Sequence, residues 1–320
     1  MKMRIARVTL VSALTAWSVA AQTPRPPAVP QDYVITPFGY FHPSCVQHVP
    51  LGATLLADGR IQHAGGSVDQ VGPSCTYPRY LSDGSLFVPG SPVRGSQSPV
   101  SNGWIENISV TTTTSYGKIS ATWTTPPQPA NNDGQTLFLF PGFEDIDDVQ
   151  TIVQPVLQYG PSAAGGGSFW AVASWNCCIS GVTEYSTLVD VSAGDTILGS
   201  ISSNCTPGGS SCPTWNVVTA DKNTGGRTTL SKTPSVGQSW NWAFGSVLEV
   251  YNVVRCGDYP ENHGVSFGVQ LYDQNLNVIS SPAWTKGPAS TGITPYCGFV
   301  LNSTATRETV EYSPKAANVQ

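Results

Sequence analysis

The chain has 320 residues, a formal net charge of −5 at pH 7 and only 11% charged residues, far below the roughly 25% usual in soluble domains. Hydrophobic residues make up 40%, which is enough for a core and excludes a charge-driven disordered chain. With 15 Lys and Arg against 20 Asp and Glu, the composition argues against a nucleic-acid surface. Beyond the N-terminus we find no apolar run of 18 residues, so no membrane span is expected.

The first 21 residues have the pattern of a secretory signal peptide. Lys2, Arg4 and Arg7 form a basic start, residues 8–20 are apolar, and Val19-Ala20-Ala21 is a small-residue cleavage site. An uncleaved anchor is the alternative, but the apolar run is short for a membrane span. We therefore expect a secreted, extracellular protein.

Cysteine usage supports the same compartment, because an even number of cysteines in an exported chain favours disulfides. Pairing Cys205 with Cys212 would close a short loop, and pairing Cys45 with Cys75 would staple the N-terminal part of the chain. Cys177 and Cys178 are adjacent, so a bond between them would be strained, which leaves two distant cysteines as their partners. The eight are Cys45, Cys75, Cys177, Cys178, Cys205, Cys212, Cys256 and Cys297.

Three Asn-x-Ser/Thr triplets, at Asn107, Asn204 and Asn302, are candidate N-glycosylation sites if the chain follows a eukaryotic secretory route. They predict a glycoprotein only in that setting.

Composition shifts divide the chain. Residues 22–31 are rich in proline, residues 32–100 are punctuated by Gly and Pro, and residues 89–103 resemble a Pro/Gly/Ser linker. We predict a signal peptide over 1–21 and an N-terminal segment with linker over 22–103. That segment is either a small subdomain or a removable pro-segment. A β-sandwich over 104–300 and a tail over 301–320 follow.

From Trp104 onward, runs of β-branched and aromatic residues alternate with turn signals, and no 3.6-residue stripe exceeds two turns. This pattern predicts an all-β fold, an antiparallel β-sandwich of jelly-roll or concanavalin-like type, behind a small irregular N-terminal segment stapled by a disulfide. The predicted strands include residues 119–123, 136–140, 151–159, 168–175, 195–202, 215–220, 246–254 and 265–272.

Common catalytic motifs are missing from the sequence. It has no Gly-x-Ser-x-Gly, no His-Glu-x-x-His and no phosphate-binding Gly-x-x-x-x-Gly-Lys. The four histidines could supply a three-His metal site, but surface or structural histidines are the simpler interpretation. The acidic stretch 144–148 could bind calcium, but a solvated loop is the simpler interpretation. We therefore expect neither a metal nor a cofactor.

Polar side chains inside two predicted strands are the remaining candidates. Alternation places Gln154 and Gln158 on one face of strand 151–159, and Glu249 and Tyr251 on one face of strand 246–254. A glutamate in an apolar strand is costly to bury without a partner, so it should face a groove or a polar group. Such carboxyls are where pKa values rise and acid–base chemistry occurs. An ordinary solvent-facing strand is the alternative.

Six segments, in matching order, resemble those of the glutamic peptidases called eqolisins. The resemblance covers residues 104–272, and the departures are Phe140 for a tryptophan, Glu144 for an aspartate, Ser174 for a glutamate, and Gly245-Ser246 where the family has a tryptophan before the strand of its catalytic glutamate. Neprosin-type peptidases are a further relative, but they use two glutamates. The segments are Tyr116–Pro126, Phe140–Asp145, Thr151–Gln154, Ser168–Trp175, Ala193–Ile197 and Val247–Glu249.

The resemblance implies a secreted, acid-active endopeptidase that needs no metal and acts on protein or peptide substrates, with nothing that requires an oligomer. Glu249 would be the general base, and the amide of Gln154, or of Gln158 in an alternative register, would support the developing oxyanion. A carbohydrate-binding or polysaccharide-active sandwich and a catalytically inactive relative are the alternatives. Expected groove residues are Trp123, Phe140, Glu144, Trp170, Trp175 and Tyr251.

Overall fold

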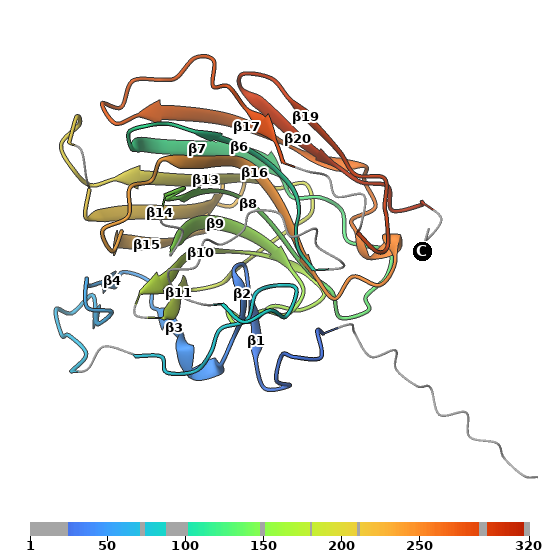
Figure 1. Ribbon diagram of the computed structural model, residues 1–320, viewed down its shortest axis with the longest axis horizontal. Helices are drawn as coiled ribbons and strands as arrows, with labels where there is room; N and C mark the ends of the chain where they lie inside the picture. The colour runs from blue at the N-terminus through green and yellow to red at the C-terminus, as the bar shows by residue number, and fades with distance from the viewer. Residues whose placement is uncertain are drawn as a thin grey trace, which may run out of the picture.

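The computed structural model describes residues 25–70, 74–87, 102–147, 151–179, 181–209, 212–287 and 293–316. Within these ranges the chain folds as two nine-stranded sheets packed face to face, with a separate two-stranded hairpin (Figure 1). The only helical pieces described are two 3-10 turns, Pro43–Cys45 and Cys256–Asp258. The predicted all-β, mainly antiparallel sandwich is therefore confirmed. The expected signal peptide and most of the expected linker lie outside the described residues.

The first sheet carries the candidate site. Its strands run in the order β18-β6-β16-β8-β9-β10-β11-β3, with β12 beside β10. In that order they are β18 (Thr285–Lys286), β6 (Gly103–Thr111), β16 (Trp242–Tyr251), β8 (Thr136–Glu144), β9 (Ile152–Tyr159), β10 (Trp170–Ile179), β11 (Val182–Ser186), β3 (Val46–Val49) and β12 (Val189–Val191).

The second sheet packs against it in the order β19-β20-β17-β7-β13-β14-β15-β4-β5. Residues beyond 300, which we expected to form a tail, supply its strands β19 and β20. The strands are β19 (Val300–Ser303), β20 (Arg307–Glu311), β17 (Gly264–Asp273), β7 (Tyr116–Thr124), β13 (Thr196–Ser203), β14 (Thr214–Asp221), β15 (Arg227–Pro234), β4 (Thr54–Leu55) and β5 (Ile61–Gln62).

The N-terminal segment, residues 25–87, joins both sheets. Its strand β3 pairs with β11 and its strand β4 pairs with β15, and both of these pairings are parallel. Its strand β5 pairs with β4 at the edge of the second sheet, and β1 (Val34–Thr36) and β2 (Gly39–Phe41) form the separate antiparallel hairpin. The hairpin lies beneath the first sheet in the view of Figure 1, on the side away from the second sheet.

Burial along the strands reflects this arrangement. Strand β14, in the second sheet, alternates between buried and half-buried residues, as a strand with one covered face should. Strands β8 and β9 are buried along their whole length. They are buried on both sides because one face meets the second sheet and the other meets the N-terminal segment. The molecule therefore has two apolar cores, one on each side of the first sheet.

Four disulfides use all eight cysteines. Cys45–Cys75 and Cys205–Cys212 are as expected. The expectation that Cys177 and Cys178 bond to distant cysteines is wrong: they bond to each other at the end of β10, and Cys256 bonds to Cys297. The reason is placement, since Cys256 and Cys297 meet in the core between the two sheets, whereas Cys177 lies on the opposite face of the first sheet. Among the described residues, no helix is long and apolar enough to cross a membrane.

Candidate functional site

Glu249 lies on β16, on the face of the first sheet that meets the N-terminal segment, and its side chain is 1% exposed. The Tyr251 hydroxyl donates a hydrogen bond to its Oε1 at 2.6 Å, and the Trp104 Nε1–H donates to its Oε2 at 3.0 Å. Burial raises the pKa of Glu249 to about 8, while these two hydrogen bonds and the charge of Arg79 act in the opposite direction. The carboxyl is thus oriented at both oxygens.

Glu144 ends strand β8 and is also buried, with 4% exposure. Burial raises its pKa to about 8, the positive charge of Arg79 lowers it, and the charge of Glu249 raises it. These interactions place two carboxyls and one guanidinium within one electrostatically coupled group.

Gln154 lies on β9, on the face of the first sheet that meets the N-terminal segment. Its Nε2 donates a hydrogen bond to the main-chain oxygen of Pro37 at 3.1 Å. Gln158 lies four residues further along β9, and its side chain is hydrogen-bonded to the loop that joins β9 to β10. Its Nε2 donates to the oxygens of Gly160 and Gly165, and its Oε1 accepts from Ser162 Oγ. Among the described residues, Gln154 is the one of these two glutamines whose amide is hydrogen-bonded to the N-terminal segment.

A short peptide connects the two sides of the site. Pro37 accepts the hydrogen bond from Gln154, and the main-chain N–H of Gly39 interacts with the Tyr251 hydroxyl, which in turn binds Glu249. Gln154 and the Tyr251–Glu249 pair therefore lie at the two ends of one tripeptide. In the described part of the chain, no direct hydrogen bond joins Gln154 to Glu249.

Arg79 comes from the N-terminal segment and is 8% exposed. Its guanidinium stacks over the rings of Phe38 and Phe87, at 3.7 and 4.2 Å. Its Nη1 also donates to Cys178 Sγ at 3.4 Å. Burial lowers the pKa of Arg79 to about 9, while Tyr251 and the two glutamates act in the opposite direction. The positive charge of Arg79 offsets part of the penalty of burying these carboxyls.

The expected groove aromatics divide between the two faces of the first sheet. Phe140, Trp175 and Tyr251 belong to the apolar cluster around the candidate site. Trp123 and Trp170 lie instead in the core between the sheets. Trp170 and Trp175 are five positions apart on one strand, an odd offset, so they point to opposite faces.

The sequence alone did not indicate several residues of the site. Trp104 binds Glu249 from the neighbouring strand β6, and Tyr40 packs edge-on against Tyr251 with ring centroids 5.3 Å apart. Pro37 and Arg79 complete the set from the N-terminal segment. All four are far from Glu249 in sequence, so no sequence motif links them to it, and only the folded chain brings them near it.

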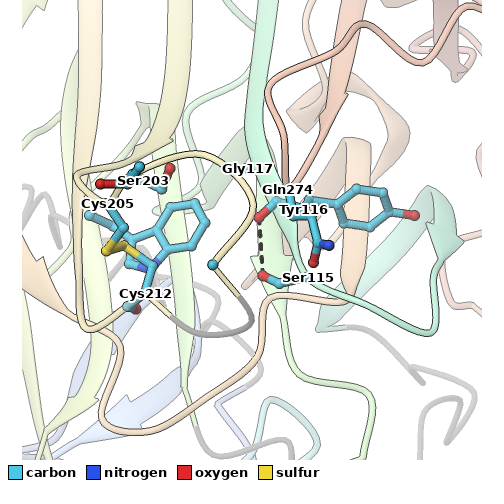
Figure 2. A pocket seen from close by; sticks show the side chains of 10 residues that line it. Ser115, Tyr116, Gly117, Ser203, Cys205, Cys212 and Gln274 are labelled. Atoms are coloured by element: carbon cyan, nitrogen blue, oxygen red, sulfur yellow. Dashed lines mark hydrogen bonds between the residues drawn. A yellow bond between two sulfur atoms is a disulfide. The ribbon is translucent and has the colours of Figure 1, made fainter.

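Other features offer little chemistry. Among the described residues, no group of three or more His, Cys, Asp or Glu side chains could hold a metal ion. A shallow pocket lies far from Glu249, beside the Cys205–Cys212 disulfide (Figure 2), and its wall has no carboxylate, histidine or lysine. It is lined by Ser115, Tyr116, Gly117, Ser203, Cys205, Thr206, Gly209, Cys212, Trp215 and Gln274.

Comparisons with known proteins give only distant likenesses. No protein-family model and no curated protein matches the chain. Scytalido-glutamic peptidase, solved with a peptide-based transition-state analog, is 13% identical with a TM-score of 0.47 over 66% of this chain and 98% of its own. SCP-B, a member of the eqolisin family solved with the tripeptide Ala-Ile-His, is 12% identical with a TM-score of 0.46 over the same shares.

A third solved structure, tailspike protein 2 from the Escherichia coli O157:H7 bacteriophage CAB120, is 14% identical with a TM-score of 0.26. It covers 52% of this chain and 21% of its own. At these identities and TM-scores the likenesses assign neither a family nor an activity, so function has to be inferred from the residues of the site.

Proposed function

We propose that this protein is a glutamic-type endopeptidase that hydrolyses peptide bonds with Glu249 and Gln154. The observation that supports this proposal is the path of the Pro37–Gly39 main chain. It crosses the face of the first sheet with a carbonyl on the Gln154 amide and an N–H on Tyr251, the residue that holds Glu249. A face that binds a peptide main chain at these two points suits a peptide substrate.

In the proposed reaction, ionised Glu249 takes a proton from a water molecule while the water oxygen attacks the substrate carbonyl carbon. The Gln154 Nε2–H donates to the oxygen on which negative charge develops. Glu249 then gives its proton to the amide nitrogen as the carbon–nitrogen bond breaks, which leaves a carboxylic acid and an amine. An amide suits the oxyanion role because it donates a hydrogen bond without titrating.

Trp104 and Tyr251 act as positioning residues. Each donates to a different oxygen of Glu249, so the carboxyl has a defined orientation and its charged form is stabilised. With the N-terminal segment in place, burial keeps the pKa of Glu249 at about 8. Exposure of the face to water would lower that pKa toward an ordinary carboxyl value, which is the condition for a base that works in acid.

The carbohydrate-directed alternative has weaker support. A sugar platform would present aromatic rings to solvent, whereas the rings on this face are covered by a peptide segment and Trp123 and Trp170 lie in the core. We further propose that the protein is exported, because four disulfides are typical of oxidising compartments.

The proposal is tested by acid proteolysis of casein between pH 3 and 7, with the chain intact and after a specific cut between residues 87 and 102. Glu249→Gln should lower the rate by at least about 10²-fold, the smaller end of the range for loss of a general base. Glu261→Gln, at an exposed position, is the matched control and should keep the rate. An undiminished rate in Glu249→Gln overturns the assignment.

A further inference from the structure

We infer that residues 25–87 form an inhibitory cover that closes the candidate site by laying Pro37–Gly39 across it as a substrate-like peptide and by holding Arg79 against Cys178 on β10. This inference concerns regulation of the same site, so its activity readout rests on the proposed function. Its structural readout does not.

Among the described residues, the cover shields the site from solvent. Gln154 and Glu249 are each 1% exposed, although neither lies between the two sheets. They are buried by an apolar cluster to which the cover and the first sheet both contribute fully buried side chains. From the cover it includes Val29, Tyr33, Ile35, Tyr40, Phe41 and Cys45, and from the sheet Phe138, Phe140, Val156, Trp175, Val247 and Tyr251.

The hairpin β1–β2 delivers the blocking peptide in a fixed position. Thr36 pairs with Gly39 across its turn, and Thr36 Oγ1 donates to the Gly39 oxygen at 3.0 Å. Tyr40 and Tyr80 exchange main-chain hydrogen bonds at 2.8 and 3.1 Å behind it. Gly39 has a φ of +109°, and a Cβ there would lie 2.3 Å from the Tyr80 oxygen. Only glycine therefore allows this approach.

Because Pro37 presents its carbonyl to Gln154, the cover uses the hydrogen bond that we assign to the substrate oxyanion. A substrate carbonyl and the Pro37 carbonyl cannot both accept it at the same place. The cover and a peptide substrate therefore compete for the same amide.

Arg79 also ties the cover to the first sheet. Its Nη1 donates to Cys178 Sγ on β10 at 3.4 Å, and its positive charge acts on Glu144 on β8 and on Glu249 on β16. The other titratable groups near Glu249 are Tyr251 on its own strand and Tyr40 from the cover, and the guanidinium of Arg25 lies 5.3 Å from the Tyr40 ring. Replacing Arg79 by an uncharged side chain of similar length should weaken the cover without altering the sheet.

The cover is attached to the sandwich by one covalent connection. Its disulfide, Cys45–Cys75, lies within the cover, and the three others lie within the sandwich. The chain between residues 87 and 102 is therefore the only covalent link, and the edge strands β3 and β4 add hydrogen-bonded anchors. A single cut in this link converts the cover into a separable ligand of the sandwich.

The experiment uses the full chain with a recognition sequence for a specific protease inserted between residues 94 and 95. Hydrogen exchange of β9 and β16 reports whether the face is covered, and casein hydrolysis reports activity, both at pH 4 and pH 8. The substitutions are Gly39→Ala and Arg79→Met. Their matched controls in the same segment are Gly66→Ala, where φ is +85° and a Cβ meets nothing within 4 Å, and Arg60→Met, at a residue paired with Asp58 on the surface.

We expect at least tenfold faster exchange in β9 and β16 and at least tenfold faster hydrolysis in the cut chain, and changes in the same direction in the two substituted chains but not in their controls. Faster exchange without hydrolysis supports a releasable cover and overturns the proposed peptidase. Unchanged exchange in the cut chain at both pH values overturns the cover. So does an intact chain that hydrolyses casein as fast as the cut one. If Gly39→Ala does not fold, the cut chain decides, because it carries no substitution within the described residues.

Discussion

Glu308 offers a quantitative test of how burial controls the stability of this sandwich. It lies on β20 in the second sheet with a fully buried side chain. Its Oε2 accepts a hydrogen bond from Ser246 Oγ at 2.9 Å, and its Oε1 has no partner among the described residues. Burial raises its pKa from 4.5 to about 8, and the bond from Ser246 acts in the opposite direction.

The sign of the effect follows from proton binding. Between pH 4.5 and about 8 the folded protein keeps the Glu308 proton while the unfolded chain loses it. The folded state binds more protons in this window, so the free energy of unfolding falls as the pH rises. At pH 7 the window has been crossed by about 2.5 units, and at about 1.36 kcal/mol per unit the loss is about 3 kcal/mol relative to pH 4. That is a large part of a typical domain stability.

Glu308→Gln removes this titration at nearly constant volume. Its effect on the unfolding free energy, measured by urea denaturation, should be more favourable at pH 7 than at pH 4 by about 3 kcal/mol. Any penalty from an unpaired amide proton applies equally at both pH values and cancels in the comparison. Glu261→Gln, on the surface, is the matched control for replacing a glutamate by glutamine. An equal effect of Glu308→Gln at pH 4 and pH 7 would refute the reasoning.

Three further outcomes follow from the structure. Trp104→Phe removes a donor that lowers the pKa of Glu249, so the acidic limb of the pH–rate profile of the cut chain should move to higher pH, and an unmoved limb contradicts the role of Trp104. In the cut chain, the cover should bind more tightly at pH 4 than at pH 8. Burial under the cover raises the pKa values of Glu144 and Glu249 to about 8, so closure takes up protons, and size-exclusion chromatography that shows tighter association at pH 8 would contradict this. Gly199→Ala would place a Cβ 2.9 Å from the Trp123 ring between the sheets, and urea denaturation should show a loss of about 1–3 kcal/mol, where a neutral effect would mean that the ring moves freely.

Local periodicity predicted much of this protein. Each strand expected from the alternation of apolar and polar residues overlaps an observed strand. The predicted same-face neighbours Ile152 and Val156 on β9, and Val247 and Tyr251 on β16, do share one apolar cluster. Strands such as β15 and β20 escaped prediction because their polar composition hides the alternation. Two of the four disulfides were also expected correctly, since short loops and segment boundaries can be recognised along the chain.

The sequence by itself determined that the chain forms strands and which way their side chains point, because the two-residue period of a strand is a local property. Only the tertiary structure decided what lies over each face. Pro37 and Arg79 reach the site from at least 65 residues away in sequence. The two amides also have different partners, the Pro37 oxygen for Gln154 and the β9–β10 loop for Gln158. Contacts of this kind arise from the packing of whole layers, which leaves no regular spacing in the chain.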